Sequence, residues 1–266
     1  MKISERGIDE YGTYADLHIS TGYGKATQRM RWIEPGTFLM GSPDGAAERW
    51  SDEGPQHSVT LTKGFWLADT ACTQALWQAV MGNNPSYFRD NEQNPVENVS
   101  WNDVQEFLRT IETLLPGVEA CLPTEAQWEY ACRAGTTTPF SFGNQITPKQ
   151  ANYDGDFPYA DGKEGEYRGH TLPVKSLPAN AWGLYEMHGN VGEWCTNDLH
   201  TYDTTPRCAA RACAGSTSSA ARARLANFIR ITAFRQSIGD DPILCRALTP
   251  DGPKQGSFID PTGQAD

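Results

Sequence analysis

Hydrophobic residues along the chain follow two different periods, and each period is confined to short segments. Residues 58–62 alternate between apolar and polar positions, as a half-buried strand does, and residues 65–68 form a second, apolar strand. Residues 29–40 predict a hairpin, because the Pro35–Gly36 dipeptide supplies the backbone angles of a type II turn between two apolar runs. Residues 14–19 show weaker strand potential.

Three segments have apolar positions with helical period and a capping residue in front of them. They are residues 74–81 after Thr73, residues 101–115 after Ser100, and residues 125–133 after Thr124. In the second and third helices, Asp103 or Gln127 follows the cap by three positions and completes a capping box. After Gly135 no period is visible, so we expect irregular structure to the end of the chain. Short helices, scattered strands and a long irregular part predict an α+β fold.

Composition and charge narrow the function classes. The 266 residues include 25 glycines and 17 prolines, so the chain must turn often. A formal net charge of −11 argues against nucleic-acid and anionic-membrane partners. No apolar run reaches the roughly 18 residues of a spanning helix, and the amino terminus lacks the apolar region of a signal peptide. We therefore expect a cytoplasmic location.

Cysteine and histidine residues form no recognisable metal or disulfide pattern. The seven cysteines are Cys72, Cys121, Cys132, Cys195, Cys208, Cys213 and Cys245. None of them forms a CxxC pair, so we expect reduced, mostly buried thiols. His57, His170 and His188 form no HxxxH or HxH pair, which leaves an iron centre unsupported. We expect His188 to be a structural hydrogen-bonding residue.

The most informative segment is LYEMHGNVGEW, residues 184–194. Asn190 and Glu193 lie three residues apart on a turn that contains two glycines. An amide oxygen, a carboxylate and free carbonyls around one small space suit a hard cation such as calcium. The alternative is a buried turn whose polar groups satisfy one another.

Several motifs, taken in order, resemble the formylglycine-generating (sulfatase-modifying factor) family. They are WIEPGTFLMGS (32–42), EGPQH (53–57), PV (95–96) with VSW (99–101), LPTEAQWEYA (122–131), ANY (151–153), LPV (172–174), PANAWGLY (178–185) and GNVGEW (189–194). The resemblance implies a C-type lectin-like fold with little regular secondary structure. It divides the chain into an N-terminal extension (1–28), the family-like domain (29–205) and a divergent C-terminal region (206–266) that could complete the same domain.

The resemblance also implies two structural calcium sites. The first would use the side chain of Asn152, the carbonyl of Tyr153, Glu166 in place of an aspartate, and a backbone oxygen near Arg168. The second would use the backbone of Gly189 and Val191 with the side chains of Asn190 and Glu193. Gly192 stands where the family often has tryptophan, which removes an aromatic wall beside this turn.

The copper-binding cysteine pair of the oxidising family members is not matched. When residues 214–216 are set on the family's G-G-S segment, the two cysteine positions fall on Ser219 and Arg224. A hydroxyl and a guanidinium do not hold copper(I), so copper is not expected. Cys208 and Cys213 have the five-residue spacing but precede Gly215, and unpaired loop thiols are the alternative to a ligand pair.

The C-terminal region permits a second alignment, because a D-P-T-G segment that many relatives carry before the closing motif occurs here at residues 260–263. Residues 206–258 would then be an insertion. The Ala-, Arg- and Ser-rich stretch 207–230 is also compatible with a frame shift or with deliberate diversification.

Three functions follow as hypotheses, and whether the chain is an enzyme stays open. The first is a recognition module that presents irregular segments of a lectin-like scaffold to a protein, peptide or glycan. The second is an oxidoreductase of the sulfatase-modifying family that modifies a protein cysteine or a small thiol. The third is a damaged or truncated relative without present activity.

Overall fold

The computed structural model describes residues 2–50, 53–196, 227–229 and 232–235. A seven-stranded sheet forms its centre, with the strand order β1-β3-β4-β7-β11-β8 and with β2 paired to β3. These strands are β1 (Lys2–Ile3), β2 (Gly7–Asp9), β3 (Gly12–Thr21), β4 (Gly24–Ile33), β7 (Phe65–Ala68), β8 (Glu119–Cys121) and β11 (Thr232–Arg235). Two smaller sheets pair β5 (Gly36–Met40) with β6 (His57–Leu61), and β9 (Gly192–Trp194) with β10 (Asn227–Ile229). The α+β class is confirmed.

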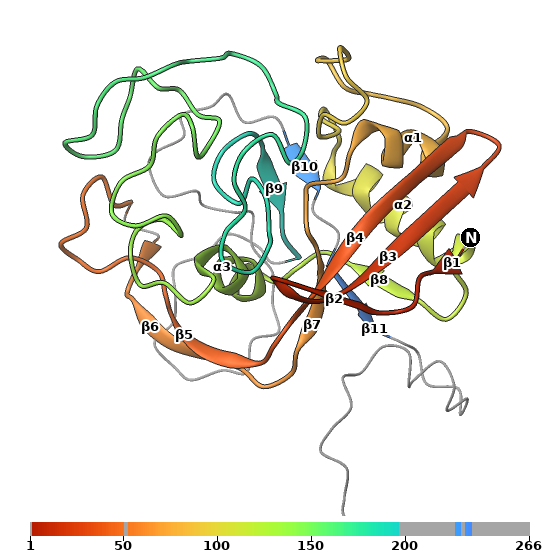
Figure 1. The fold of residues 1–266 in the computed structure, drawn as a ribbon, viewed down its shortest axis with the longest axis horizontal. Helices are drawn as coiled ribbons and strands as arrows, with labels where there is room; N and C mark the ends of the chain where they lie inside the picture. Colours follow the sequence, from red (N-terminus) through yellow and green to blue (C-terminus); the bar gives the residue numbers. More distant parts are fainter. Residues whose placement is uncertain (1, 51–52, 197–226, 230–231, 236–266) are drawn as a thin grey trace, which may run out of the picture.

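Two hydrophobic cores lie on either side of β4 and β7. Helices α1 (Gln74–Met81) and α2 (Trp101–Leu114) cover one face of the large sheet (Figure 1), where Trp77 of α1 stacks on Phe107 of α2 with ring centroids 4.9 Å apart. Helix α3 (Glu125–Arg133) packs with the β5–β6 ribbon in the second core. The irregular part of the chain, residues 136–191, surrounds α3.

The predicted helices and their caps are confirmed. The Thr73 hydroxyl accepts a hydrogen bond from the Leu76 amide at 3.1 Å, and Gly82 ends α1 in the left-handed conformation. Helices α2 and α3 both begin with complete capping boxes. Strand β7 has the predicted bounds, and β6 begins one residue earlier than predicted.

The hairpin predicted for residues 29–40 is wrong. β4 pairs with β3 and β7, whereas β5 pairs with β6 in a separate ribbon. The turn that does join two long strands is Gly22–Tyr23, between β3 and β4, where Gly24 has φ 157°. Pro35 lacks a backbone N–H, and it separates two strands that leave for different sheets instead of turning back on each other.

The segment 1–28, predicted as an N-terminal extension, supplies β1, β2, β3 and the first part of β4 to the large sheet. Leu17 and Ile19 of β3 are buried in the core under α1 and α2. These residues are therefore integral to the fold, and the weak strand potential at residues 14–19 is part of a strand of ten residues.

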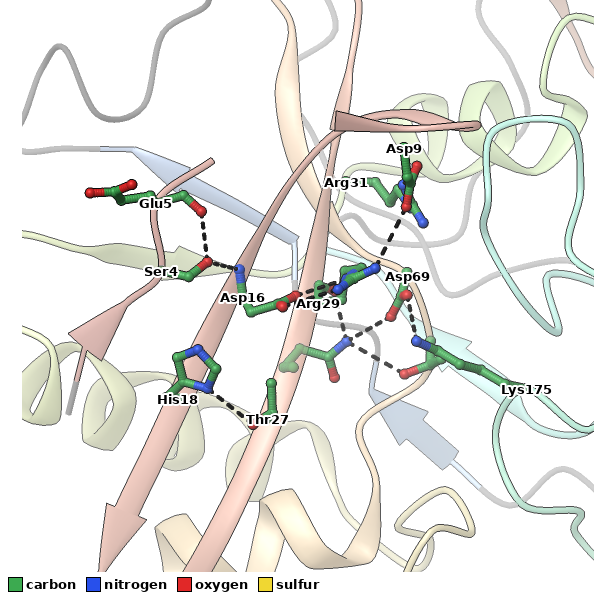
Figure 2. Close-up of polar contacts among 12 residues, drawn as sticks. Ser4, Glu5, Asp9, Asp16, His18, Thr27, Arg29, Arg31, Asp69 and Lys175 are labelled. Carbon is green, nitrogen blue, oxygen red and sulfur yellow. Dashed lines mark hydrogen bonds and ion pairs between the residues drawn. The ribbon is translucent and has the colours of Figure 1, made fainter. Parts of the chain in front are cut away.

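Polar contacts fix the same segment to the rest of the domain (Figure 2). Asp9 accepts a hydrogen bond from Arg31 at 2.6 Å, and the Asp16 carboxylate accepts two from Arg29, at 2.8 and 3.1 Å. The Arg31 side chain is buried, and its hydrogen bond to Asp9 holds the pKa of Asp9 below the usual value. Burial makes this pair structurally important, because removing one partner would leave a charge without compensation.

The prediction of irregular structure after Gly135 holds for residues 136–191, which contain no helix or extended strand. It is wrong further on, where β9 pairs in parallel with β10 and β11 joins the large sheet between β7 and β8. These strands have three or four residues each, too few for a sequence period to reveal. Within the described residues, no helix is both long and apolar enough to cross a membrane.

Candidate functional site

A cavity of about 260 Å³ lies between α3, the end of the β5 strand and the irregular segments. Its lining comes from residues 41–43 and 45–47, Glu53, Gln56, one face of α3, residues 137–141, Ile146, Ala151, Tyr153, Tyr159 and residues 187–189. On α3 the lining residues are spaced as one helical face: Glu125, Trp128, Glu129, Cys132 and Arg133. The opposite face of the helix, with Ala126, Tyr130 and Ala131, is buried in the second core. The helix thus anchors one wall of the cavity to the hydrophobic core.

A set of ionic contacts makes the wall next to α3 rigid. Arg133 lies 2.6 Å from the Glu129 carboxylate and donates to the carbonyl oxygen of Gly41 at 3.0 Å. Glu129 in turn accepts a hydrogen bond from the Gly41 amide at 2.9 Å. The Glu53 carboxylate accepts from the Ser42 hydroxyl at 2.6 Å and from the Trp50 amide at 3.2 Å. These contacts tie the end of β5 to the helix.

His188 occupies the cavity wall as a neutral imidazole. Its Nε2 accepts a hydrogen bond from the Ser141 amide at 3.1 Å. A backbone amide only donates, so Nε2 carries the lone pair and the proton of the neutral ring is on Nδ1. Burial, together with the positive charge of Arg133, lowers the pKa of His188 to about 4. His188 therefore acts as the structural hydrogen-bonding residue expected from the sequence.

Cys132 lies beside this ring without forming a catalytic pair with it. Its Sγ is 3.8 Å from Nδ1 and 3.7 Å from Nε2 of His188, and it donates to the carbonyl oxygen of Met187 at 3.5 Å. The Nε2 lone pair is already taken by Ser141, and a neutral imidazole does not stabilise a thiolate. The lone pair of His188 is therefore directed at Ser141, whereas a cysteine nucleophile is activated by a base directed at its thiol.

Four aromatic side chains complete the lining: Trp128, Phe140, Tyr153 and Tyr159. Phe140 and Tyr159 meet edge to face with centroids 5.1 Å apart, and the Tyr153 hydroxyl donates to the Ile146 carbonyl at 3.2 Å. Among the described residues, the Tyr159 hydroxyl has no hydrogen-bond partner. Burial and the nearby carboxylates of Glu48 and Glu53 raise the pKa of Tyr159.

The residues predicted for the second calcium site do not converge on one point. The Asn190 Oδ1 accepts from the Leu172 amide at 2.8 Å and from Asn152 Nδ2 at 3.0 Å. The Glu193 carboxylate instead accepts from the Trp128 indole at 2.6 Å. Gly189 is needed here, because a Cβ on it would lie 2.3 Å from the carbonyl oxygen of Asn152. A cation at this turn would have to replace existing hydrogen bonds.

The first predicted site lies directly beside the second. Asn152 Nδ2 donates to the His170 carbonyl at 2.8 Å as well as to Asn190, while its Oδ1 accepts no hydrogen bond from the described residues. Glu166 forms an ion pair with Arg168 at 2.8 Å and is largely exposed. Asn152 therefore offers one oxygen donor, whereas Glu166 is paired with a neighbouring cation. Tyr153, the remaining member, directs its side chain into the cavity lining.

The sites predicted from cysteine spacing are described only in part. Ser219, Arg224, Cys208 and Cys213 lie outside the described residues. The cysteines Cys72, Cys121, Cys132 and Cys195 lie within the described residues, and all but Cys121 are buried. Burial and two nearby glutamates raise the pKa of Cys121 to about 11. In the described part of the chain, no three or more His, Cys, Asp or Glu side chains gather in a group that could hold a metal ion.

Sequence reasoning did not find the cavity, because its lining comes from segments far apart in the chain. One signal was present in α3. The charged and aromatic residues at positions 125, 128, 129, 132 and 133 share one helical face, opposite a face of alanine and tyrosine. A helix with one buried apolar face and one face of charged and aromatic residues indicates that the second face lines a cavity or a binding surface.

Comparison with solved structures defines the class of protein. Treponema denticola variable protein 1 superposes with a TM-score of 0.62 at 24% identity, covering 83% of this chain and 99% of that one. PvdO from Pseudomonas aeruginosa superposes with a TM-score of 0.58 at 24% identity, covering 78% of this chain and 94% of that one. At these identities the likeness shows the fold alone. It confirms the C-type lectin-like, sulfatase-modifying-factor fold predicted from the sequence.

Sequence comparison identifies the family. Residues 19–240 match the family described as "Sulfatase-modifying factor enzyme 1-like domain", and the chain belongs to this family. The formylglycine-generating enzyme of Thermomonospora curvata is 30% identical in an alignment of 213 positions that covers 74% of this chain and 61% of that enzyme. The inactive C-alpha-formylglycine-generating enzyme 2 of Bos taurus is 33% identical over 146 residues, 54% of this chain and 44% of that protein. The chain thus spans less than two thirds of these relatives.

Proposed function

We propose that this chain is a recognition module of the sulfatase-modifying factor family and that the cavity beside α3 receives part of a protein, peptide or glycan ligand. The main support for this proposal is the wall of the cavity: it is formed by one face of α3, whose charged groups already have ionic and hydrogen-bond partners within the protein. Such a wall holds its shape without a ligand, as binding pockets usually do. The irregular segments around it are the kind of structure on which recognition is usually carried.

The chemistry of the cavity supports binding in preference to catalysis. The Cys132 sulfur lies 3.7 Å from Nε2 of His188, and that nitrogen accepts a hydrogen bond from the Ser141 amide. One structural neighbour is named a variable protein, which suits a scaffold used for recognition. We therefore place binding before reaction chemistry for this site.

The experiment compares binding to peptide and glycan arrays for the wild-type chain and two tryptophan variants. Ala47 lines the cavity and is exposed, so Ala47→Trp should fill its mouth and abolish the specific signal. Ala181 is also exposed and does not line the cavity, so Ala181→Trp should bind as the wild type does. Specific binding that survives Ala47→Trp would reject the cavity as the recognition site.

A second candidate function is oxidation of a cysteine. The 30% identity to the Thermomonospora curvata enzyme favours it, whereas the alignment of Ser219 and Arg224 with the copper ligands opposes it. A copper equivalent retained after purification, with oxygen uptake in the presence of a Cys-Thr-Pro-Ser-Arg peptide, would establish this function and displace the first.

We further propose that calcium binds beside the Gly189 turn as a structural cross-link. The close approach of Asn152 to Asn190 and the available Asn152 Oδ1 support it. The wild-type chain should gain thermal stability on moving from chelator to calcium, and Asn152→Ala, which removes the available Oδ1, should gain less. Equal gains in the two chains would remove Asn152 from the metal site, and no gain in the wild type would remove the metal.

A further inference from the structure

Carboxylates outnumber basic groups in the lining of the cavity. Glu53, Glu125 and Glu129 all line it, and Arg133 is the one Lys or Arg side chain among the described lining residues. The imidazole of His188 is neutral near pH 7 because its pKa lies at about 4. The lining thus holds three carboxyl groups and one guanidinium group. A site of this sign repels anions and attracts cations.

The positive charge of Arg133 is already neutralised within the wall. Its guanidinium lies 2.6 Å from the Glu129 carboxylate and donates to the carbonyl oxygens of Gly41 and Thr138. It therefore presents little charge to a ligand. The nearby Arg49 forms its ion pair with Asp44, at 3.4 Å.

Within the described part of the chain, the Glu53 carboxyl group has no cationic partner. The residue is only 5% exposed, and among the described residues its carboxylate contacts the Ser42 hydroxyl and the Trp50 amide but no basic side chain. Both are neutral donors, so they stabilise the carboxylate and do not cancel its charge. A buried negative charge of this kind favours a cation that enters the same space.

The aromatic lining adds a second attraction of the same sign. Trp128, Phe140, Tyr153 and Tyr159 surround the space, and the electron-rich ring faces of such residues attract ammonium and guanidinium groups. Within the described part of the chain, the Tyr159 hydroxyl has no hydrogen-bond partner, so it offers an acceptor to an N–H group. Burial is the main cause of the raised pKa of Tyr159, and the negative charges of Glu48 and Glu53 add to it.

We propose, on the basis of the recognition function above, that the cavity binds an organic cation: the guanidinium or ammonium group of an arginine or lysine side chain in a peptide or protein partner. The volume of about 260 Å³ lies below the roughly 300–1,000 Å³ of pockets for drug-sized ligands, which suits a single side chain. An acidic partner and a phosphate group are disfavoured by the same charges.

The test uses three small probes on the full chain: N-acetyl-arginine amide, its neutral isostere N-acetyl-citrulline amide, and N-acetyl-glutamate amide. Binding is followed by calorimetry and by the tryptophan fluorescence to which Trp128 contributes. The arginine probe should bind about tenfold or more tightly than the citrulline probe, and the glutamate probe should not bind. Added salt should weaken arginine binding and leave citrulline binding unchanged.

Two variants locate the effect in the cavity. Glu53→Gln removes the charge and keeps the shape, and Tyr159→Leu removes a ring, so each should weaken arginine binding about fivefold or more. Glu106→Gln removes an exposed carboxylate from α2, outside the cavity, and should leave arginine binding unchanged. Thermal unfolding of each variant checks that the fold is intact.

The outcomes separate this inference from the proposed function. Equal affinity for the arginine and citrulline probes, or equal weakening by Glu53→Gln and Glu106→Gln, would overturn the cation site. Recognition by the cavity would still stand if a neutral or acidic array ligand were lost in Ala47→Trp. Failure of every probe and of every array ligand would overturn both.

Discussion

Lowering the pH should destabilise this protein through His188. In the folded chain, burial and the charge of Arg133 hold the pKa of His188 at about 4, whereas an unfolded histidine titrates near 6.5. Below pH 6.5 the unfolded chain therefore takes up a proton that the folded chain refuses. Protonation in the folded state would also replace the hydrogen bond from the Ser141 amide to Nε2 with two opposed donors.

The size of the effect follows from the two pKa values. The contribution of His188 is constant above about pH 7, decreases as the pH falls from 6.5 toward 4, and levels off below the folded-state pKa. At about 1.4 kcal/mol per pH unit, the free energy of unfolding should fall by about 3 kcal/mol over this window. That is a large part of the roughly 5–15 kcal/mol stability of an ordinary domain.

Urea unfolding at pH 7 and pH 4.5, followed by tryptophan fluorescence, measures this loss. His188→Gln keeps an acceptor for the Ser141 amide and does not titrate, so it should lose about 2 kcal/mol less than the wild type between these pH values. Carboxylates that titrate in both chains cancel in the difference. Parallel losses in the two chains would show that His188 is not the group responsible and that its ring is not held neutral by burial.

Three further changes test the framework around the site. Asn180→Ala should cost about 3 kcal/mol of unfolding free energy, because the buried amide donates to the Ala131 carbonyl and accepts from the Leu184 amide; equal urea midpoints for variant and wild type would contradict this. Phe107→Ala should cost about 3–5 kcal/mol, since the ring is fully buried. Trp101→Ala, at an exposed position on the same helix, should cost less than about 1 kcal/mol and serves as its control.

Local signals in the sequence predicted the helices, whereas the pairing of strands depended on distant partners. The Ser100 and Thr124 capping boxes bind within four residues, so the sequence alone specifies them. The strand before Pro35 finds its partners in β3 and β7, and the strand after it pairs with β6. A turn signal in the sequence cannot reveal that the strands before and after it pair with other strands of the chain instead of with each other.

In the candidate site, too, the sequence predicted the local turn and not the tertiary contacts of its side chains. The GNVGEW motif placed Asn190 and Glu193 on one turn, but it could not show that Asn190 would meet Asn152 while Glu193 would meet Trp128. Those partners come from loops and helices 38 and 65 residues away. Side-chain spacing fixes which groups are near the turn, and tertiary packing decides which of them face each other.

Helix α3 packs against the hydrophobic core on one face and lines the cavity on the other. Substitutions on the two faces should therefore have different effects on stability and on ligand binding. Ala126, Tyr130 and Ala131 bury one face, so changes there would unfold the wall. Glu125 and Trp128, on the other face, line the cavity, and Trp128 also packs against the edge of the second core, so a substitution there changes the shape or charge of the cavity while Ala126, Tyr130 and Ala131 keep their core contacts. A scaffold in which one helix face carries stability and the other faces the ligand can exchange ligands at small cost in folding free energy. Substituting Trp128 by phenylalanine should therefore alter arginine-probe affinity, and it should cost about 1.5–3 kcal/mol of unfolding free energy because the indole hydrogen bond to the Glu193 carboxylate is lost; a loss well above this range would show that the two faces are not independent.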